Sequence, residues 1–200
     1  MIYLGLTGSI GMGKSATAQL FRDEGVPVYD ADAAVHRIYE PGGSAVEAIA
    51  VEFPHAIEDG RVNRAALREI VIDDADLLKK LESIVHPLVG ETQQEFRKHA
   101  EESGADIAVL DIPLLFETGG NERVDYVVVV TAPADIQRER VMAREGMTEA
   151  ILEAILAKQT PDAEKRARAD FIINTVIDID YAREQVRSLL SAIRRKHGSK

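Results

Sequence analysis

The chain has 200 residues, of which 46% are hydrophobic and 29% charged, a composition typical of a globular α/β domain with insertions. Its formal net charge of −10 disfavours extended contact with nucleic acid or an anionic membrane, and the lack of cysteine excludes disulfides and a cysteine nucleophile. The chain has no apolar run near the roughly 20 residues of a membrane span, and no signal-peptide layout. We therefore expect a cytoplasmic protein of small-molecule substrates, with no nucleic acid, membrane or obligate protein partner.

The first predicted elements are a buried strand at Ile2–Leu6 and a helix that continues through Ala16–Phe21. Between them, Gly8–Ser15 reads GSIGMGKS, which matches the phosphate-binding pattern G-x-x-x-x-G-K-[ST] in full. We expect Gly8 and Gly13 to adopt backbone conformations closed to residues with a Cβ. Successive N–H groups and the helix N-terminus can then converge on phosphate oxygens. This order of strand, loop and helix predicts a nucleoside-triphosphate site.

The loop assigns roles to its residues. Lys14 should reach the β- and γ-phosphates of ATP, and the Ser15 hydroxyl should ligate Mg²⁺, the hard cation that a triphosphate requires. The expected ATP-binding residues of the loop are Gly8, Gly11, Met12, Gly13, Lys14, Ser15 and Ala16.

Two carboxylates, Asp30 and Asp32, follow the second predicted strand, Val26–Tyr29. Strand C-termini border the ligand crevice of an open parallel sheet, so both carboxylates could approach the γ-phosphate. Asp32 is the better candidate for the base that receives a hydroxyl proton, and Asp30 for holding water around the metal. Alternatively, either residue only caps the helix expected near Ala33.

The long interval before the next strand, roughly residues 33 to 104, contains no convincing strand and shows helical spacing of its apolar residues. We expect Pro87 to interrupt one helix there and to lie in the first turn of another. Such an insert is the natural place for a second substrate. His86 is a candidate substrate contact, or a helix cap or packed polar group.

Asp111 closes the third predicted strand, Ile107–Leu110, and could serve the metal or cap a turn. After the fourth strand, Tyr126–Val130, Arg140 and Arg144 are spaced to share a helix face, as in a lid that closes on phosphates.

The alternative for these two arginines is a solvated face paired with Glu139 and Glu145. Lys165 and Arg168 are weaker candidates for nucleotide contacts near the last strand, Phe171–Ile173.

Short apolar strands alternating with helices predict an α/β fold with a doubly wound, parallel, five-stranded sheet. The expected domains are a nucleotide-binding core (1–32, 104–139 and 168–200), a helical acceptor insert (33–103) and a small helical lid (140–167). The residues alone also fit another small-molecule P-loop kinase, such as a nucleoside monophosphate or sugar kinase. A nucleotide switch is disfavoured because neither Asp-x-x-Gly nor Asn-Lys-x-Asp occurs, and a nucleic-acid-dependent ATPase because the chain is acidic.

Taken together, the motifs resemble those of the dephospho-CoA kinase family. The matching segments are Leu6–Ser15, Asp30–Asp32, His86–Pro87, Pro113–Glu117, Arg140–Arg144 and Gln159–Phe171. The resemblance implies a P-loop NTPase-type kinase that uses ATP to phosphorylate the ribose 3′-hydroxyl of dephospho-CoA, the last step of coenzyme A biosynthesis. It implies Asp32 as the base, residues 11–16 as the ATP loop and Arg140 as a lid contact.

The chain departs from the family pattern at three places. Ser9 replaces a glycine and Ala16 a threonine, at loop positions that act mainly through backbone amides. The segment Asn174–Val176 stands where many members have Asp-Asn and a glycine, and this affects the expected contact on the adenine side.

Overall fold

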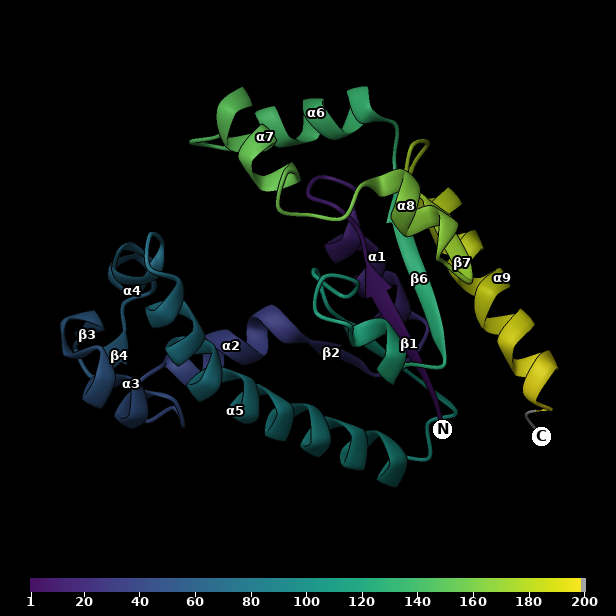
Figure 1. The fold of residues 1–200 in the computed structure, drawn as a ribbon. Helices are drawn as coiled ribbons and strands as arrows, with labels where there is room; N and C mark the ends of the chain where they lie inside the picture. The colour runs from purple at the N-terminus through teal and green to yellow at the C-terminus, as the bar shows by residue number, and fades with distance from the viewer. Residues whose placement is uncertain (199–200) are drawn as a thin grey trace. The chain divides into compact units, whose positions relative to one another are not determined.

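A computed structural model of the chain describes residues 1–198. The chain divides into two compact units, one formed by Met1–Tyr29 and Ala100–Lys200 and the other by Asp30–His99 (Figure 1). The finer boundaries expected for an insert (33–103) and a lid (140–167) stay predictions.

The first unit is built on a five-stranded sheet with the strand order β2-β5-β1-β6-β7. The pairs β1/β5, β1/β6 and β6/β7 are all parallel. The predicted doubly wound sheet is thereby confirmed, and each predicted strand is found at its place. The strands are β1 (Ile2–Thr7), β2 (Val28–Asp30), β5 (Ile107–Asp111), β6 (Tyr126–Thr131) and β7 (Phe171–Asn174).

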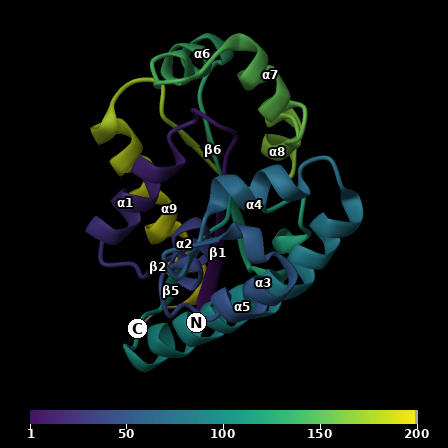
Figure 2. The same ribbon diagram turned by 90° about the vertical axis from the view of Figure 1, so that its left-hand side faces the viewer.

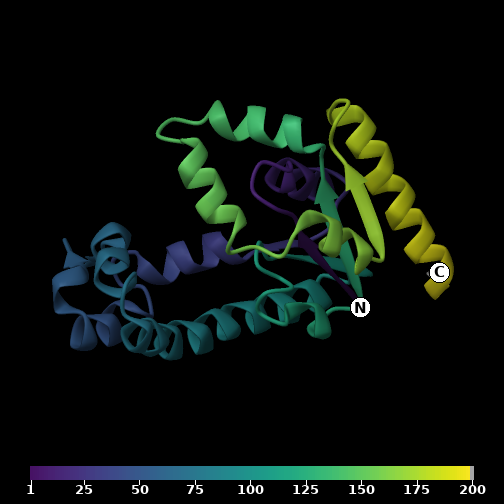
Figure 3. The same cartoon turned by 45° about the horizontal axis from the view of Figure 1, so that its top comes forward.

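Helices follow the strands of this unit, as crossover connections between parallel strands require. Figure 3 shows α6 leaving the end of β6, with α7 and α8 leading the chain back toward β7. The helices are α1 (Lys14–Asp23), α6 (Ala134–Met142), α7 (Glu149–Leu156), α8 (Asp162–Ala167) and α9 (Ile179–His197), with a 3₁₀ turn η2 (Gly120–Arg123).

Both faces of the central strands are buried, which explains their continuous apolar runs. Along β6, Val128 and Val130 pack in one core with α1 and α9, which lie side by side (Figure 2). Val127 and Val129 pack in a second core with Leu115, from the segment that follows β5. One face of the sheet is therefore covered by α1 and α9. The second core is covered by the segment after β5 together with Ala169, which follows α8, a helix that contacts β6.

The second unit is mainly helical and has its own core, in which Ala45, Ile49 and Ala56 are fully buried. Its elements are α2 (Ala31–Tyr39), α3 (Val46–Glu52), η1 (Pro54–Ala56), β3 (Ile57–Glu58), β4 (Arg61–Val62), α4 (Arg64–Val71) and α5 (Ala75–Glu102). Within residues 1–198, none of the helices combines the length and the apolarity that crossing a membrane demands.

The expectation that this interval contains no strand is wrong, because β3 and β4 form a short antiparallel hairpin. Asp59 and Gly60 connect the two strands, with φ of 50° and 74°. Positive φ at both central residues is the geometry of tight hairpin turns, and Asp-Gly is among the sequences that favour it. The strands have two residues each and are too short to show alternation.

The expectation that Pro87 ends a helix is also wrong, because α5 runs from Ala75 to Glu102 with Pro87 inside it. Proline removes one helical hydrogen bond at a cost of about 3 kcal/mol. On either side of it, Val85 and Leu88 pack into the core of the second unit. Burial of this helical face offsets the local cost.

Candidate functional site

The phosphate loop lies between β1 and α1, as its sequence predicts. Gly13 is the N-cap of α1 and has a left-handed φ of 91°, which a residue with a Cβ rarely adopts. Gly8 has no positive φ, and its role differs from the expected one. A Cβ there would lie 2.7 Å from the Val130 carbonyl oxygen, so Gly8 permits close approach to β6.

Lys14 directs its ammonium at the end of β5. Its Nζ lies 2.7 Å from Oδ1 of Asp111, whose side chain is 3% exposed. Asp111 pairs in register with Leu6 of β1, and this places its carboxylate beside the phosphate loop. The two expected site residues are thus brought together. Within residues 1–198, no three His, Cys, Asp or Glu side chains are grouped to hold a metal ion.

The loop is held by side chains from α6 and from the segment after α7. The sequence did not single out Gln137, whereas Gln159 begins the family-like segment Gln159–Phe171 but had no assigned role. Gln137 Nε2 donates to the Ile10 carbonyl oxygen at 2.7 Å, and Gln159 Oε1 accepts from the Ile10 amide at 3.2 Å. The Ala132 amide donates to Met12 Sδ at 3.0 Å. These contacts hold the backbone of the loop in one conformation.

Arg140 and Arg144 line a cavity of about 330 Å³ beside this loop. Arg140 donates to the hydroxyl and to the carbonyl oxygen of Thr175, whereas Arg138 forms the ion pair with Glu149. The structure therefore gathers loop, arginines and the segment after β7 around one space. The lining residues are Gly11, Gly13, Ala16, Thr17, Arg140, Arg144, Thr175, Ile177, Asp178, Ile179 and Ala182.

Lys165 and Arg168 do not contact this cavity. The Lys165 side chain is fully buried and its ammonium lies 3.1 Å from Glu117 Oε1, an ion pair that lacks hydrogen-bond geometry. Arg168 lies over the Phe116 ring, 4.2 Å from its centroid. Both cations thus contact the Pro113–Glu117 segment.

The surroundings of Glu117 favour its charged form. Burial acts to raise the pKa of this carboxyl group, but hydrogen bonds from the Thr160 amide and its own amide, together with the charge of Lys165, outweigh burial. The net result is a pKa below the usual range for glutamate.

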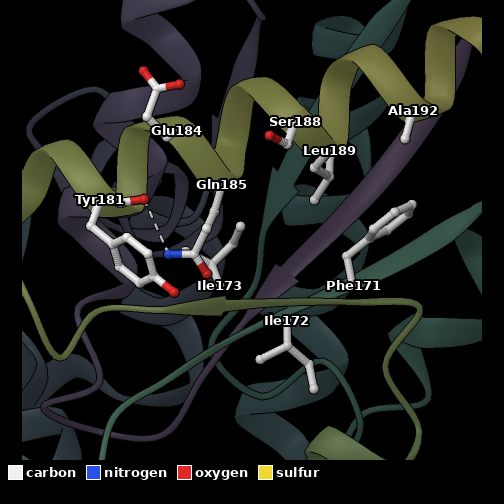
Figure 4. Close-up of a pocket in the computed structure, with 9 residues that line it drawn as sticks. All are labelled: Phe171, Ile172, Ile173, Tyr181, Glu184, Gln185, Ser188, Leu189 and Ala192. Atoms are coloured by element: carbon white, nitrogen blue, oxygen red, sulfur yellow. Dashed lines mark hydrogen bonds between the residues drawn. The ribbon is translucent and has the colours of Figure 1, made fainter.

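A second cavity of the first unit, of about 470 Å³, lies between β7 and α9 and includes none of the predicted site residues (Figure 4). Its lining residues are Phe171, Ile172, Ile173, Tyr181, Glu184, Gln185, Ser188, Leu189 and Ala192.

The remaining candidates lie in the second unit. Asp30 Oδ1 accepts a hydrogen bond from the Ala33 amide at 2.9 Å, so this residue is the N-cap of α2. Asp32 lies exposed in the first turn of that helix, and His86 lies exposed on α5. The capping alternative therefore holds for Asp30, and Asp32 is available to a ligand.

This unit also has a cavity of about 510 Å³, whose lining includes Arg61 and Arg64 together with Glu40, Glu58 and Asp59. Burial raises the pKa of Tyr39, which lines the same cavity, and the charge of Arg64 opposes this effect. The lining thus combines the donors of two arginines and the phenol with three carboxylates, so its charge does not by itself select an anionic ligand.

The family model and the curated relatives agree on one family. The family described as "CoaE: Dephospho-CoA kinase" matches residues 2–181. A curated "Dephospho-CoA kinase" of Rhodopseudomonas palustris strain HaA2 is 58% identical over 98% of this chain and 97% of its own length.

Among solved structures, TT1252 from Thermus thermophilus superposes with a TM-score of 0.84 at 36% identity, over 96% of this chain and 97% of its own. The structure of "Dephospho-CoA kinase from Campylobacter jejuni" shares the fold, with a TM-score of 0.65 at 23% identity over 96% of each chain. The match over residues 2–181 covers the phosphate loop, Asp111 and Arg140 together, and the chain belongs to the dephospho-CoA kinase family.

Proposed function

We propose that this chain transfers the γ-phosphoryl group of ATP to the ribose 3′-hydroxyl of dephospho-CoA, giving coenzyme A and ADP. The observation that carries the proposal is the phosphate loop with its Lys14–Asp111 pair, inside a family match to residues 2–181. The high identity to curated dephospho-CoA kinases favours this acceptor over nucleoside monophosphates or sugars.

The loop and Lys14 would bind the triphosphate. Amides of residues 11–16 would hold phosphate oxygens, and the Lys14 ammonium would follow the charge that develops on the moving phosphoryl group. Arg140 and Arg144, which line the adjoining cavity, would donate further hydrogen bonds to the negatively charged phosphoryl oxygens. Most of the acceleration would come from positioning and electrostatics.

The residues at the loop also fit Mg²⁺. The exposed Ser15 hydroxyl and the Asp111 carboxylate are hard oxygen donors, and Mg²⁺ typically takes few protein ligands beside phosphates and water. When bound, the ion would neutralise phosphate charge. Asp30 is a weaker candidate, because its carboxylate caps α2.

Asp32 would act as the base. Its carboxylate would accept the 3′-hydroxyl proton as the ribose oxygen bonds to the γ-phosphorus and the bond to the β-γ bridging oxygen breaks. The second unit, with Asp32 and His86, would receive the acceptor. The enzyme would act on small molecules in the cytoplasm without an obligate protein partner, and the net charge of −10 disfavours extended contact with nucleic acid or an anionic membrane.

The test is ADP release by the purified chain with ATP and Mg²⁺, in the presence and absence of dephospho-CoA. We expect ADP only with the acceptor, and a product whose ³¹P spectrum shows a 3′-phosphomonoester. Adenosine monophosphate and simple sugars serve as competing acceptors. Acceptor-independent hydrolysis, or faster transfer to a competing acceptor, would refute the proposal.

A further inference from the structure

Thr175 contacts both the phosphate loop and the lid arginine. Its hydroxyl donates to the Met12 carbonyl oxygen at 2.9 Å and accepts from Arg140 Nη1 at 2.9 Å. Its carbonyl oxygen accepts from Arg140 Nη2 at 2.6 Å. One residue therefore connects α6 with the loop that carries Lys14.

The Thr175 hydroxyl acts both as a hydrogen-bond donor and as an acceptor. A hydroxyl has one proton to donate, and the Met12 carbonyl oxygen is closer to it than the Thr131 carbonyl oxygen at 3.5 Å. The oxygen then accepts the Arg140 donor, so a valine of the same shape could make neither contact. The side chain also fills the space beside Gly13, where a Cβ would lie 3.1 Å from Thr175 Oγ1.

The segment that carries Thr175 is held on both sides. The Thr175 amide donates to the Thr131 carbonyl oxygen at 3.0 Å, which continues the sheet beyond β7. The side-chain amide of Gln185 pairs with both backbone groups of Asn174, at 2.9 and 2.8 Å. Figure 4 shows Gln185 reaching from α9 toward β7 beside Ile173. Thr175 thus presents its hydroxyl from a fixed position.

We propose that Thr175 is a positioning residue for phosphoryl transfer, which orients Arg140 against the phosphate loop. A guanidinium group has five N–H donors. The hydroxyl and carbonyl oxygens of Thr175 accept two of the N–H donors of Arg140. The remaining N–H groups can donate to the phosphoryl oxygens of the transition state. The inference rests on the proposed kinase function. It adds a positioning residue in Asn174–Val176, one of the three places where the chain departs from the family pattern.

Thr175→Val tests the hydroxyl without changing the shape of the side chain. We expect kcat to fall about tenfold, because the contact acts on an arginine that stabilises the transition state. The KM for dephospho-CoA should stay within about twofold. Thr175→Ser, which keeps the hydroxyl, should recover most of the turnover that Thr175→Val loses. Thr118→Val is the matched control, since it removes one exposed hydroxyl contact, to the Leu114 carbonyl oxygen.

A double-mutant cycle separates positioning from a general loss of structure. If Thr175 acts through Arg140, then Thr175→Val should lower kcat by less than about twofold in an Arg140→Ala background. If the effects of the two substitutions on kcat are additive, or if Thr175→Val leaves kcat unchanged, the inference is overturned. The proposed kinase function is tested separately, by the activity of the wild-type enzyme. Circular dichroism reports folding, and Thr175→Ala replaces Thr175→Val in the cycle if the latter does not fold.

Discussion

The ammonium of Lys14 and the carboxylate of Asp111 form an ion pair of 2.7 Å at the junction of the phosphate loop with β5. Their side chains are 16% and 3% exposed, so this ion pair is largely shielded from solvent. The pair fixes the direction of the lysine side chain. Its role in catalysis and its role in stability can be separated by substitution.

Lys14→Met should lower kcat at least about 100-fold, because the charge that stabilises the transferring phosphoryl group is lost. It should also destabilise the fold, since the buried Asp111 carboxylate loses its ion pair with the Lys14 ammonium. The double variant with Asp111→Asn should regain thermal stability but not turnover. Steady-state kinetics and the midpoint of thermal unfolding measure the two effects.

Lys158→Ala, at an exposed lysine of the same unit, is the control and should change neither quantity appreciably. Near-normal turnover in Lys14→Met would contradict the assignment of this lysine.

Asp32→Asn should lower kcat by about 100-fold or more, the usual contribution of a positioned general base. Stability should change little, because Asp32 is exposed and lies in the first turn of α2. Asp23→Asn is the matched control, an exposed aspartate at the end of α1. An Asp32→Asn enzyme with undiminished kcat would remove this residue from the role of base.

The parts of the molecule that the sequence predicts well are those encoded by neighbouring residues. The pattern Gly8–Ser15 fixes a loop between its own strand and helix, and apolar runs such as Tyr126–Val130 indicate strands buried on both faces. Asp30 illustrates a local ambiguity, since a carboxylate after a strand suits both a ligand site and a helix cap.

What the sequence does not reveal depends on contacts between distant segments. The hydrogen bond from Gln137 to the Ile10 carbonyl oxygen joins positions 127 residues apart, and no local pattern marks this glutamine. Lys165 looks like a phosphate-binding cation in sequence, yet it is buried against Glu117. The sequence Asp59-Gly60 favours a hairpin turn, but the strands on either side have only two residues each and show no alternating pattern that would have predicted them.

Glu117→Gln should destabilise the fold at neutral pH by roughly 3 kcal/mol, because it leaves the buried Lys165 ammonium without an ion-pair partner. The pKa of Glu117 is depressed in the folded chain, so its stabilising effect is present above the unfolded pKa of about 4.3 and is lost as pH falls through the folded value. The difference in unfolding free energy between wild type and variant should therefore narrow below about pH 4.

Urea unfolding at a series of pH values measures this difference. Glu122→Gln, at an exposed glutamate, should stay within about 0.5 kcal/mol of wild type throughout. A gap that stays constant from pH 7 to pH 3 would argue against a depressed pKa at Glu117.

Pro87→Ala should raise the stability of the chain, because Pro87 lies inside the continuous helix α5. Alanine restores a backbone donor and has a helix propensity about 3 kcal/mol better than proline, although it also frees the unfolded chain. The net gain should be about 1 to 2 kcal/mol. Gly90→Ala is the control in the same helix, since a Cβ there meets open space, and it should stabilise by up to about 1 kcal/mol. If Gly90→Ala stabilises the chain but Pro87→Ala destabilises it, the expected gain is contradicted. The local geometry that Pro87 imposes on α5 is then required for the packing of Val85 and Leu88.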